Sequence, residues 1–183
     1  MKILYYDCFA GISGDMNLAA MIDLGIKPTY LTGELKKLKL EGYDLVVSRD
    51  QRHGISGTRV DVQLKQTNDQ SYRTLSDIER IIGNSKLNEN ITSRSMEMFR
   101  ILAEAEARVH NKTPETIHFH EVGAIDSIVD IVGAAICFDR LDVDRILAST
   151  IELGGGFVNK FVLSTATKIS VLSTYKSSPE LKS

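Results

Sequence analysis

The stretch of the chain richest in reactive side chains is residues 117–130, which hold two imidazoles and three carboxylates within fourteen positions. His118 and His120 alternate around Phe119, so an extended backbone would turn both rings to one face. The two aspartates are four residues apart, so a helix would place both carboxylates on one side. Nitrogen and oxygen donors at such short range suit zinc, nickel or iron. The predicted metal ligands are His118, His120, Glu121, Asp126 and Asp130.

A structural interpretation of the same stretch stays open at this point. Histidines at a strand end can hydrogen-bond to backbone groups, and Asp126 can serve as a helix N-cap. The spacing matches no standard zinc motif. The flexible Val122–Gly123–Ala124 join nevertheless allows the strand and the helix to fold toward each other.

A second candidate site is the glycine-bearing turn at residues 7–15, where a strand is expected to end and a helix to begin. Open α/β sheets bind ligands at such positions, and a helix N-terminus favours a phosphate charge. The two aspartates suit a magnesium ion that bridges to the phosphate. The alternative is an ordinary tight turn with Asp15 as helix cap. The candidate phosphate-binding residues are Asp7, Gly11, Ser13, Gly14 and Asp15.

The remaining histidines and the two cysteines are weaker candidates. Cys8, near a helix start, could carry an activated thiolate, but the role of a small apolar filler is favoured. Cys137 is expected to be inert on an apolar helix. His53 is expected in a solvated turn, and His110 at the end of a long helix, where a positive charge suits the dipole.

Length and composition indicate one medium-sized domain with an appendage, in a chain of 183 residues with a net charge of −2. No apolar run is long enough for a membrane span, and the start does not read as a signal peptide, so a cytoplasmic location is expected. The absence of a basic stripe argues against nucleic acid as a partner. Two cysteines give no disulfide framework.

Alternating strand and helix patterns predict an α/β fold, with a mixed sheet and flanking helices. A buried strand is expected at residues 2–7, and a hairpin connection at residues 53–57 joins two further strands. Gly154–Gly156 is expected to close the last strand. The expected strands are 2–7, 43–49, 58–65 and 145–153, and the expected helices are 15–24, a short one after Pro28, 76–82, 91–110 and 126–141.

The last part of the chain differs in composition. Residues 159–183 carry four lysines and one glutamate and are rich in Ser and Thr, whereas the whole chain is slightly acidic. We therefore expect a folded domain over residues 1–158 and a divergent, mostly disordered tail over 159–183.

Three blocks read together resemble the LarC-type nickel-insertion family: residues 7–16, residues 118–133 and the Gly154–Phe157 segment. The segments Gly54–Thr58 and Ala103–Ala107 fit the family as well. This resemblance covers residues 1 to about 158, and its middle block is highly specific. It implies insertion of nickel into pyridinium-3,5-bisthiocarboxylic acid mononucleotide, the precursor of the pincer cofactor of lactate racemase. The implied activity is that of a nickel chelatase, which is a lyase. The implied reaction forms one nickel–carbon and two nickel–sulfur bonds and uses CTP with Mg²⁺ or Mn²⁺.

The chain departs from the family pattern in two places. Its 67–73 loop lacks the histidine-rich tract of many relatives, which puts nickel storage there in doubt. Residues 159–183 do not continue the family pattern, and a change of reading frame would explain this difference. The resemblance implies that CTP binds mainly in the C-terminal part of the relatives, which this sequence does not match.

Nickel insertion is therefore the leading hypothesis, with His118, His120 and Glu121 as transient nickel donors. The alternatives are a non-catalytic nickel or nucleotide binding module that needs a separate C-terminal LarC-type partner chain, a metal-dependent phosphohydrolase, and an inactive truncation.

Overall fold

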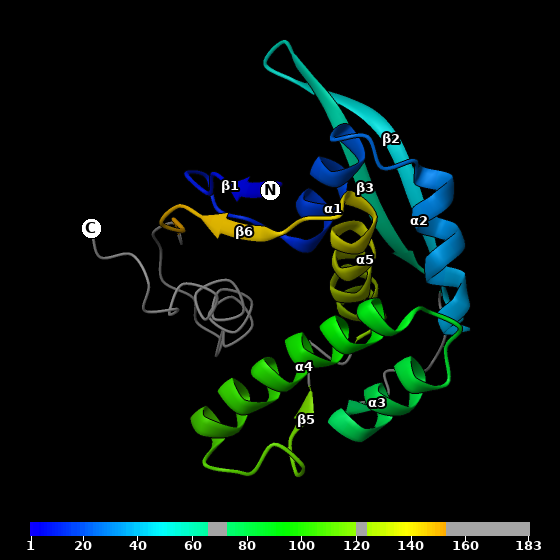
Figure 1. Ribbon diagram of the computed structural model, residues 1–183, viewed down its shortest axis with the longest axis vertical. Helices are drawn as coiled ribbons and strands as arrows, with labels where there is room; N and C mark the ends of the chain where they lie inside the picture. Colours follow the sequence, from blue (N-terminus) through cyan, green and yellow to red (C-terminus); the bar gives the residue numbers. More distant parts are fainter. Residues whose placement is uncertain (66–72, 120–123, 153–183) are drawn as a thin grey trace.

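The computed structural model describes residues 1–65, 73–119 and 124–152 (Figure 1). For Arg52 and His118 it describes the backbone but not the side chain. The predicted tail and the Gly154–Gly156 segment lie outside the described ranges. Within them, no helix is both long and apolar enough to cross a membrane. The elements in chain order are β1 (Ile3–Tyr6), α1 (Gly14–Asp23), α2 (Pro28–Leu35), η1 (Lys36–Leu38), β2 (Tyr43–Arg52), β3 (Ile55–Leu64), β4 (Arg73–Thr74), α3 (Leu75–Gly83), α4 (Glu89–His110), β5 (His118–Phe119), α5 (Ile125–Leu141) and β6 (Arg145–Ala148).

The α/β fold class is confirmed, and the predicted helices agree with the observed ones to within about two residues. Parallel and antiparallel pairings both occur, but in separate small sheets. In the described part of the chain, β1 pairs with β6 in parallel, whereas β2 with β3 and β4 with β5 are antiparallel.

The hairpin of β2 and β3 is longer than the sequence predicts. Its strands run to a two-residue turn at His53 and Gly54, which have φ angles of 50° and 83°. Two positive φ values in a two-residue loop match the twist of the flanking strands, so pairing continues up to the turn. Asp23, at the end of α1, accepts hydrogen bonds from the N–H and the hydroxyl of Thr58 at 3.1 and 2.6 Å, and these bonds tie the hairpin to α1.

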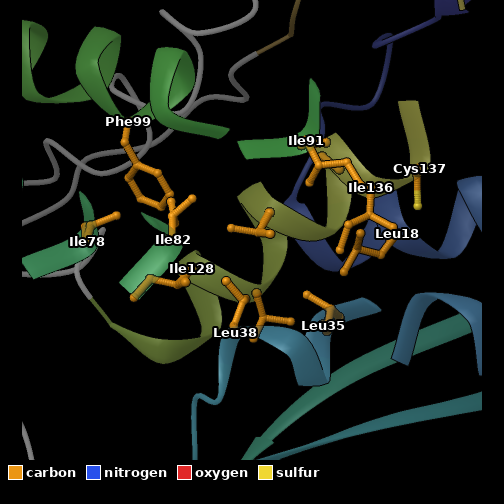
Figure 2. Close-up of a cluster of buried hydrophobic side chains, with 14 of the residues drawn as sticks. Leu18, Leu35, Leu38, Ile78, Ile82, Ile91, Phe99, Ile128, Ile136 and Cys137 are labelled. Carbon is orange, nitrogen blue, oxygen red and sulfur yellow. The ribbon is translucent and has the colours of Figure 1, made fainter. Parts of the chain in front are cut away.

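The core is built around α5, which has buried side chains along most of its length. Figure 2 shows Leu18 of α1 beside Ile136 of α5, and Phe99 of α4 near Ile82 of α3. The Phe99 ring also meets the buried Phe119 of β5, with centroids 6.5 Å apart. Helices from both halves of the chain therefore share one apolar interior.

Among the residues that the structure describes, only one face of the β1–β6 pair packs against the core. Leu4, Tyr6 and Ile146 face the core, whereas Ile3 and Tyr5 stay 47% and 60% exposed. The prediction of a buried strand at residues 2–7 was wrong in this respect, because an apolar run gives no information about how many layers cover a strand. Strand β6 also ends at Ala148, before the predicted residue 153.

Candidate functional site

The turn after β1 packs against the segment after β6. The N–H of Cys8 donates to the Ser149 hydroxyl at 2.8 Å, and the N–H of Glu152 donates to the Cys8 carbonyl at 3.3 Å. Gly11 closes the turn with a φ of 81°, and a Cβ there would lie 3.3 Å from the Glu152 carbonyl oxygen. A side chain at this position would therefore be both strained and crowded.

Helix α1 starts immediately after this turn. Ser13 is its N-cap residue, but its side chain makes no capping hydrogen bond and instead contacts the Asp15 carboxylate. Asp15 accepts the N–H of Met16 at 2.9 Å. The alternative in which Asp15 caps the helix was wrong, since Asp15 lies inside the first turn.

Asp130 of α5 reaches the start of α1. A Cβ at Gly14 would lie 1.9 Å from Oδ2, 2.2 Å from Cγ and 2.6 Å from Cβ of Asp130. Only a glycine leaves room for this approach. One predicted metal ligand and one predicted phosphate-binding residue, far apart in sequence, are thus in direct contact.

This contact changes the electrostatics expected at the helix N-terminus. A carboxylate beside the first turn interacts favourably with the partial positive charge of the helix end. The same carboxylate would repel a phosphate placed there, and Asp15 adds a second negative charge. An anion at this turn therefore fits only together with a cation that separates it from the carboxylates.

Asp126 and Asp130 lie one turn apart on α5, as their spacing predicts. Ala124 is the N-cap residue, so the alternative in which Asp126 caps the helix was wrong. Asp126 accepts the N–H of Ser127 at 2.7 Å from within the first turn. Both aspartates are half-buried, a position from which oxygen atoms can reach an ion at the helix start.

Of the histidine half of the predicted site, the structure describes only the backbone of His118. His118 pairs with Thr74 of β4, so the predicted extended conformation is confirmed at this residue. The His118 side chain, His120 and Glu121 lie outside the described residues. Among the side chains that the structure does describe, no three of His, Cys, Asp and Glu converge on a possible metal position. The five-residue metal set stays a prediction.

The two cysteines are buried, as favoured for both. Burial raises the pKa of the Cys8 thiol, with a smaller effect from Asp7, and raises the pKa of Cys137 to about 12. Both side chains are therefore neutral thiols at pH 7, and the hypothesis of an activated thiolate at Cys8 is wrong. The exposed His53 lies in the hairpin turn and His110 ends α4, as expected.

Sequence reasoning missed two residues that shape this end of the molecule. The Tyr6 hydroxyl donates to Asn17 of α1 at 2.7 Å, and burial raises the pKa of Tyr6 well above its usual range. Ser149 holds the turn through its bond with Cys8, 141 residues away in sequence. No local pattern marks either residue, because the Tyr6 contact depends on how β1 packs against α1 and the Ser149 contact on the pairing of β1 with β6.

Several known proteins are similar to this chain in sequence. Proteins named pyridinium-3,5-bisthiocarboxylic acid mononucleotide nickel insertion protein from Clostridium kluyveri, Clostridium acetobutylicum and Akkermansia muciniphila are 54%, 48% and 48% identical to the chain. Each alignment covers 86% of this chain but only 42%, 45% and 41% of the relative, so the chain spans less than half the length of these relatives. No solved structure matches the chain.

The matching family model carries the description "Nickel insertion protein" and covers residues 4–161. Those residues include β1 from Leu4 onward, the glycine turn, the 117–130 stretch and β6. The chain therefore belongs to the nickel insertion protein family.

Proposed function

We propose that this chain is the nickel-handling part of a protein that inserts nickel into pyridinium-3,5-bisthiocarboxylic acid mononucleotide. The observation that carries the proposal is the packing of Asp130 directly against Gly14. It joins the metal-donor stretch to the glycine turn, so a nickel ion and the substrate's phosphate would meet within one site.

Nickel is the cargo in this proposal, and its ligands must release it. His118, His120 and Glu121 supply the primary donors, and Asp126 and Asp130 supply oxygen atoms or orient the imidazoles. Mixed nitrogen and oxygen donors bind nickel more exchangeably than a closed set of thiolates. The buried, neutral thiols of Cys8 and Cys137 leave sulfur ligation to the substrate.

The phosphate of the substrate is proposed to bind at Asp7, Gly11, Ser13, Gly14 and Asp15. Because Asp130 already lies at the start of α1, a cation must accompany that phosphate, and nickel or a magnesium ion meets this requirement. The proposal includes lyase-type chelatase activity in the cytoplasm, leading to the cofactor of lactate racemase. CTP with Mg²⁺ or Mn²⁺ would bind mainly in the part of the relatives that this chain does not match.

Nickel binding tests the site directly. Titration calorimetry with Ni²⁺ should show binding to the wild-type chain and its loss in the His118→Ala/His120→Ala double variant. His53→Ala/His110→Ala removes the other two of the four histidines and serves as the matched control. Equal nickel affinity in both double variants would refute the assignment.

A second candidate function is favoured by the lengths of the relatives. The chain covers only 42% of the Clostridium kluyveri protein, so it could act as a binding module that passes nickel to a C-terminal partner. Incubation with nickel, CTP, Mg²⁺ and the unmetallated nucleotide separates the two functions. Nickel-containing product from this chain alone supports insertion, whereas product only after addition of the C-terminal part supports the module.

A further inference from the structure

The sheet of β1 and β6 has an open apolar face. Ile3, Tyr5 and Leu147 are 47%, 60% and 42% exposed on it, while the neighbouring side chains on both strands turn inward. Tyr5 and Leu147 are direct partners in the register, so their side chains lie together on this face. We name Ile3, Tyr5 and Leu147 the open sheet face.

An uncovered parallel sheet is unusual. Parallel sheets occur almost only with both faces covered, and a two-stranded sheet is marginal on its own. Here one face packs on the core through Leu4, Tyr6 and Ile146, and the other carries large apolar side chains. Figure 1 shows β1 and β6 at one side of the molecule, away from α3. The open sheet face therefore has the character of an interface that another polypeptide segment covers.

The lengths of the relatives point to one candidate for that segment. The family match ends at residue 161, only a short distance after β6 ends at Ala148. In the Clostridium kluyveri relative, more than half of the chain lies outside the alignment. Thirteen residues separate the end of β6 from residue 161, so the part of a relative's chain that follows the match would lie within reach of this sheet. Arg145 pairs with Ile3 in the register and is exposed on the same face, so the covering surface should be apolar with an acidic residue.

We infer that the open sheet face is the docking surface for the C-terminal part of the nickel insertion proteins. That part completes the β1–β6 sheet with an apolar surface, whether it belongs to the same polypeptide or to a separate one. The inference rests on the proposed function only in the choice of partner.

Co-purification tests the inference without nickel or nucleotide, so its outcome is independent of the metal site. The full chain is produced together with the part of the Clostridium kluyveri relative that lies outside the alignment. Tyr5→Asp/Leu147→Asp should lower the recovered partner about tenfold or more, because a buried unpaired charge is costly in an apolar interface. Ile55→Asp/Leu64→Asp changes two exposed apolar residues of the hairpin and is the matched control.

Two results would overturn the inference: no partner recovered with the wild-type chain, or equal recovery with both double variants. A photo-crosslinking residue, benzoylphenylalanine, in place of Tyr5 identifies the occupant without disturbing the fold. Adducts to the C-terminal part support the inference. Adducts to a second copy of this chain or to its own residues 153–183 contradict it. Thermal unfolding of each variant verifies that the fold is intact.

Discussion

Gly14 should be intolerant of even one added methyl group. An alanine there would place its Cβ 1.9 Å from Oδ2 and 2.6 Å from Cβ of Asp130. Rotation of the Asp130 side chain can move Oδ2 but not Cβ, which is fixed to the backbone of α5. Carbon atoms in contact lie about 3.5–4.0 Å apart, so α1 and α5 must separate by about 1 Å.

The expected net effect follows from two opposing contributions. Overpacking of this kind costs about 1–3 kcal/mol. Replacing glycine by alanine inside a helix gains at most about 1 kcal/mol, and Gly14 is only the first residue of α1. Gly14→Ala should therefore lower the free energy of unfolding by about 1–2 kcal/mol. Urea unfolding followed by circular dichroism measures this change.

Gly33 provides the matched control. It lies within α2, and a Cβ added there would meet nothing within 4 Å. Gly33→Ala should raise the free energy of unfolding by up to about 1 kcal/mol, opposite in sign to Gly14→Ala. Asp130→Gly removes all three crowding atoms, so the Gly14→Ala/Asp130→Gly cycle should show a favourable coupling of about 1 kcal/mol or more. If Gly14→Ala proves as stable as Gly33→Ala, or if the cycle shows no coupling, the reasoning about this contact fails.

Two further predictions concern stability at acid pH and the reactivity of the thiols. Hydrogen bonds from the N–H and hydroxyl of Thr74 lower the pKa of Asp77 in the capping box of α3. The ionised Asp77 therefore stabilises the fold above a pH of about 4, and this contribution is lost as the pH falls through the lower pKa of the folded state. Asp77→Asn should flatten the acid part of the stability profile, and an unchanged profile would contradict this. Cys8 and Cys137 are 2% and 0% exposed, so a thiol reagent should modify both only in denaturant. Rapid labelling of the native chain would show that one of them is accessible.

The helices could be predicted from sequence because each has strong local signals. Pro28 starts α2, and Gly25, with a φ of 110°, follows the end of α1. Asp126 and Asp130 are four residues apart, and this spacing predicted that both lie on the same side of α5. These features depend only on neighbouring residues, so periodicity and capping preferences are sufficient to find them.

The long-range features could not be predicted from sequence. The apolar run from Ile3 to Tyr6 predicts a strand, but its half-open environment depends on which layers pack on it. The approach of Asp130 to Gly14 depends on the crossing of α1 and α5, elements more than a hundred residues apart. The sequence showed two candidate sites, and only the packing of these helices showed that they adjoin.

Two glycines, one on each helix, make this crossing close. A Cβ at Gly133 of α5 would lie 2.9 Å from Cδ2 of Leu18 on α1, and Gly14 of α1 receives Asp130. The two contacts differ in what they constrain. Leu18 meets Gly133 with the end of a flexible side chain, which can rotate away, whereas Asp130 meets Gly14 with its Cβ. The position of the Asp130 Cβ relative to the glycine turn is therefore fixed by the backbones of the two helices, which keeps the carboxylate near the start of α1. In the proposed metal site, a carboxylate anchored in this way needs little reorganisation to accept an ion, while the proposed donor His118 belongs to a different element, β5. Under the proposed function, donors carried on two separate elements would allow the nickel ion to be released, as delivery requires.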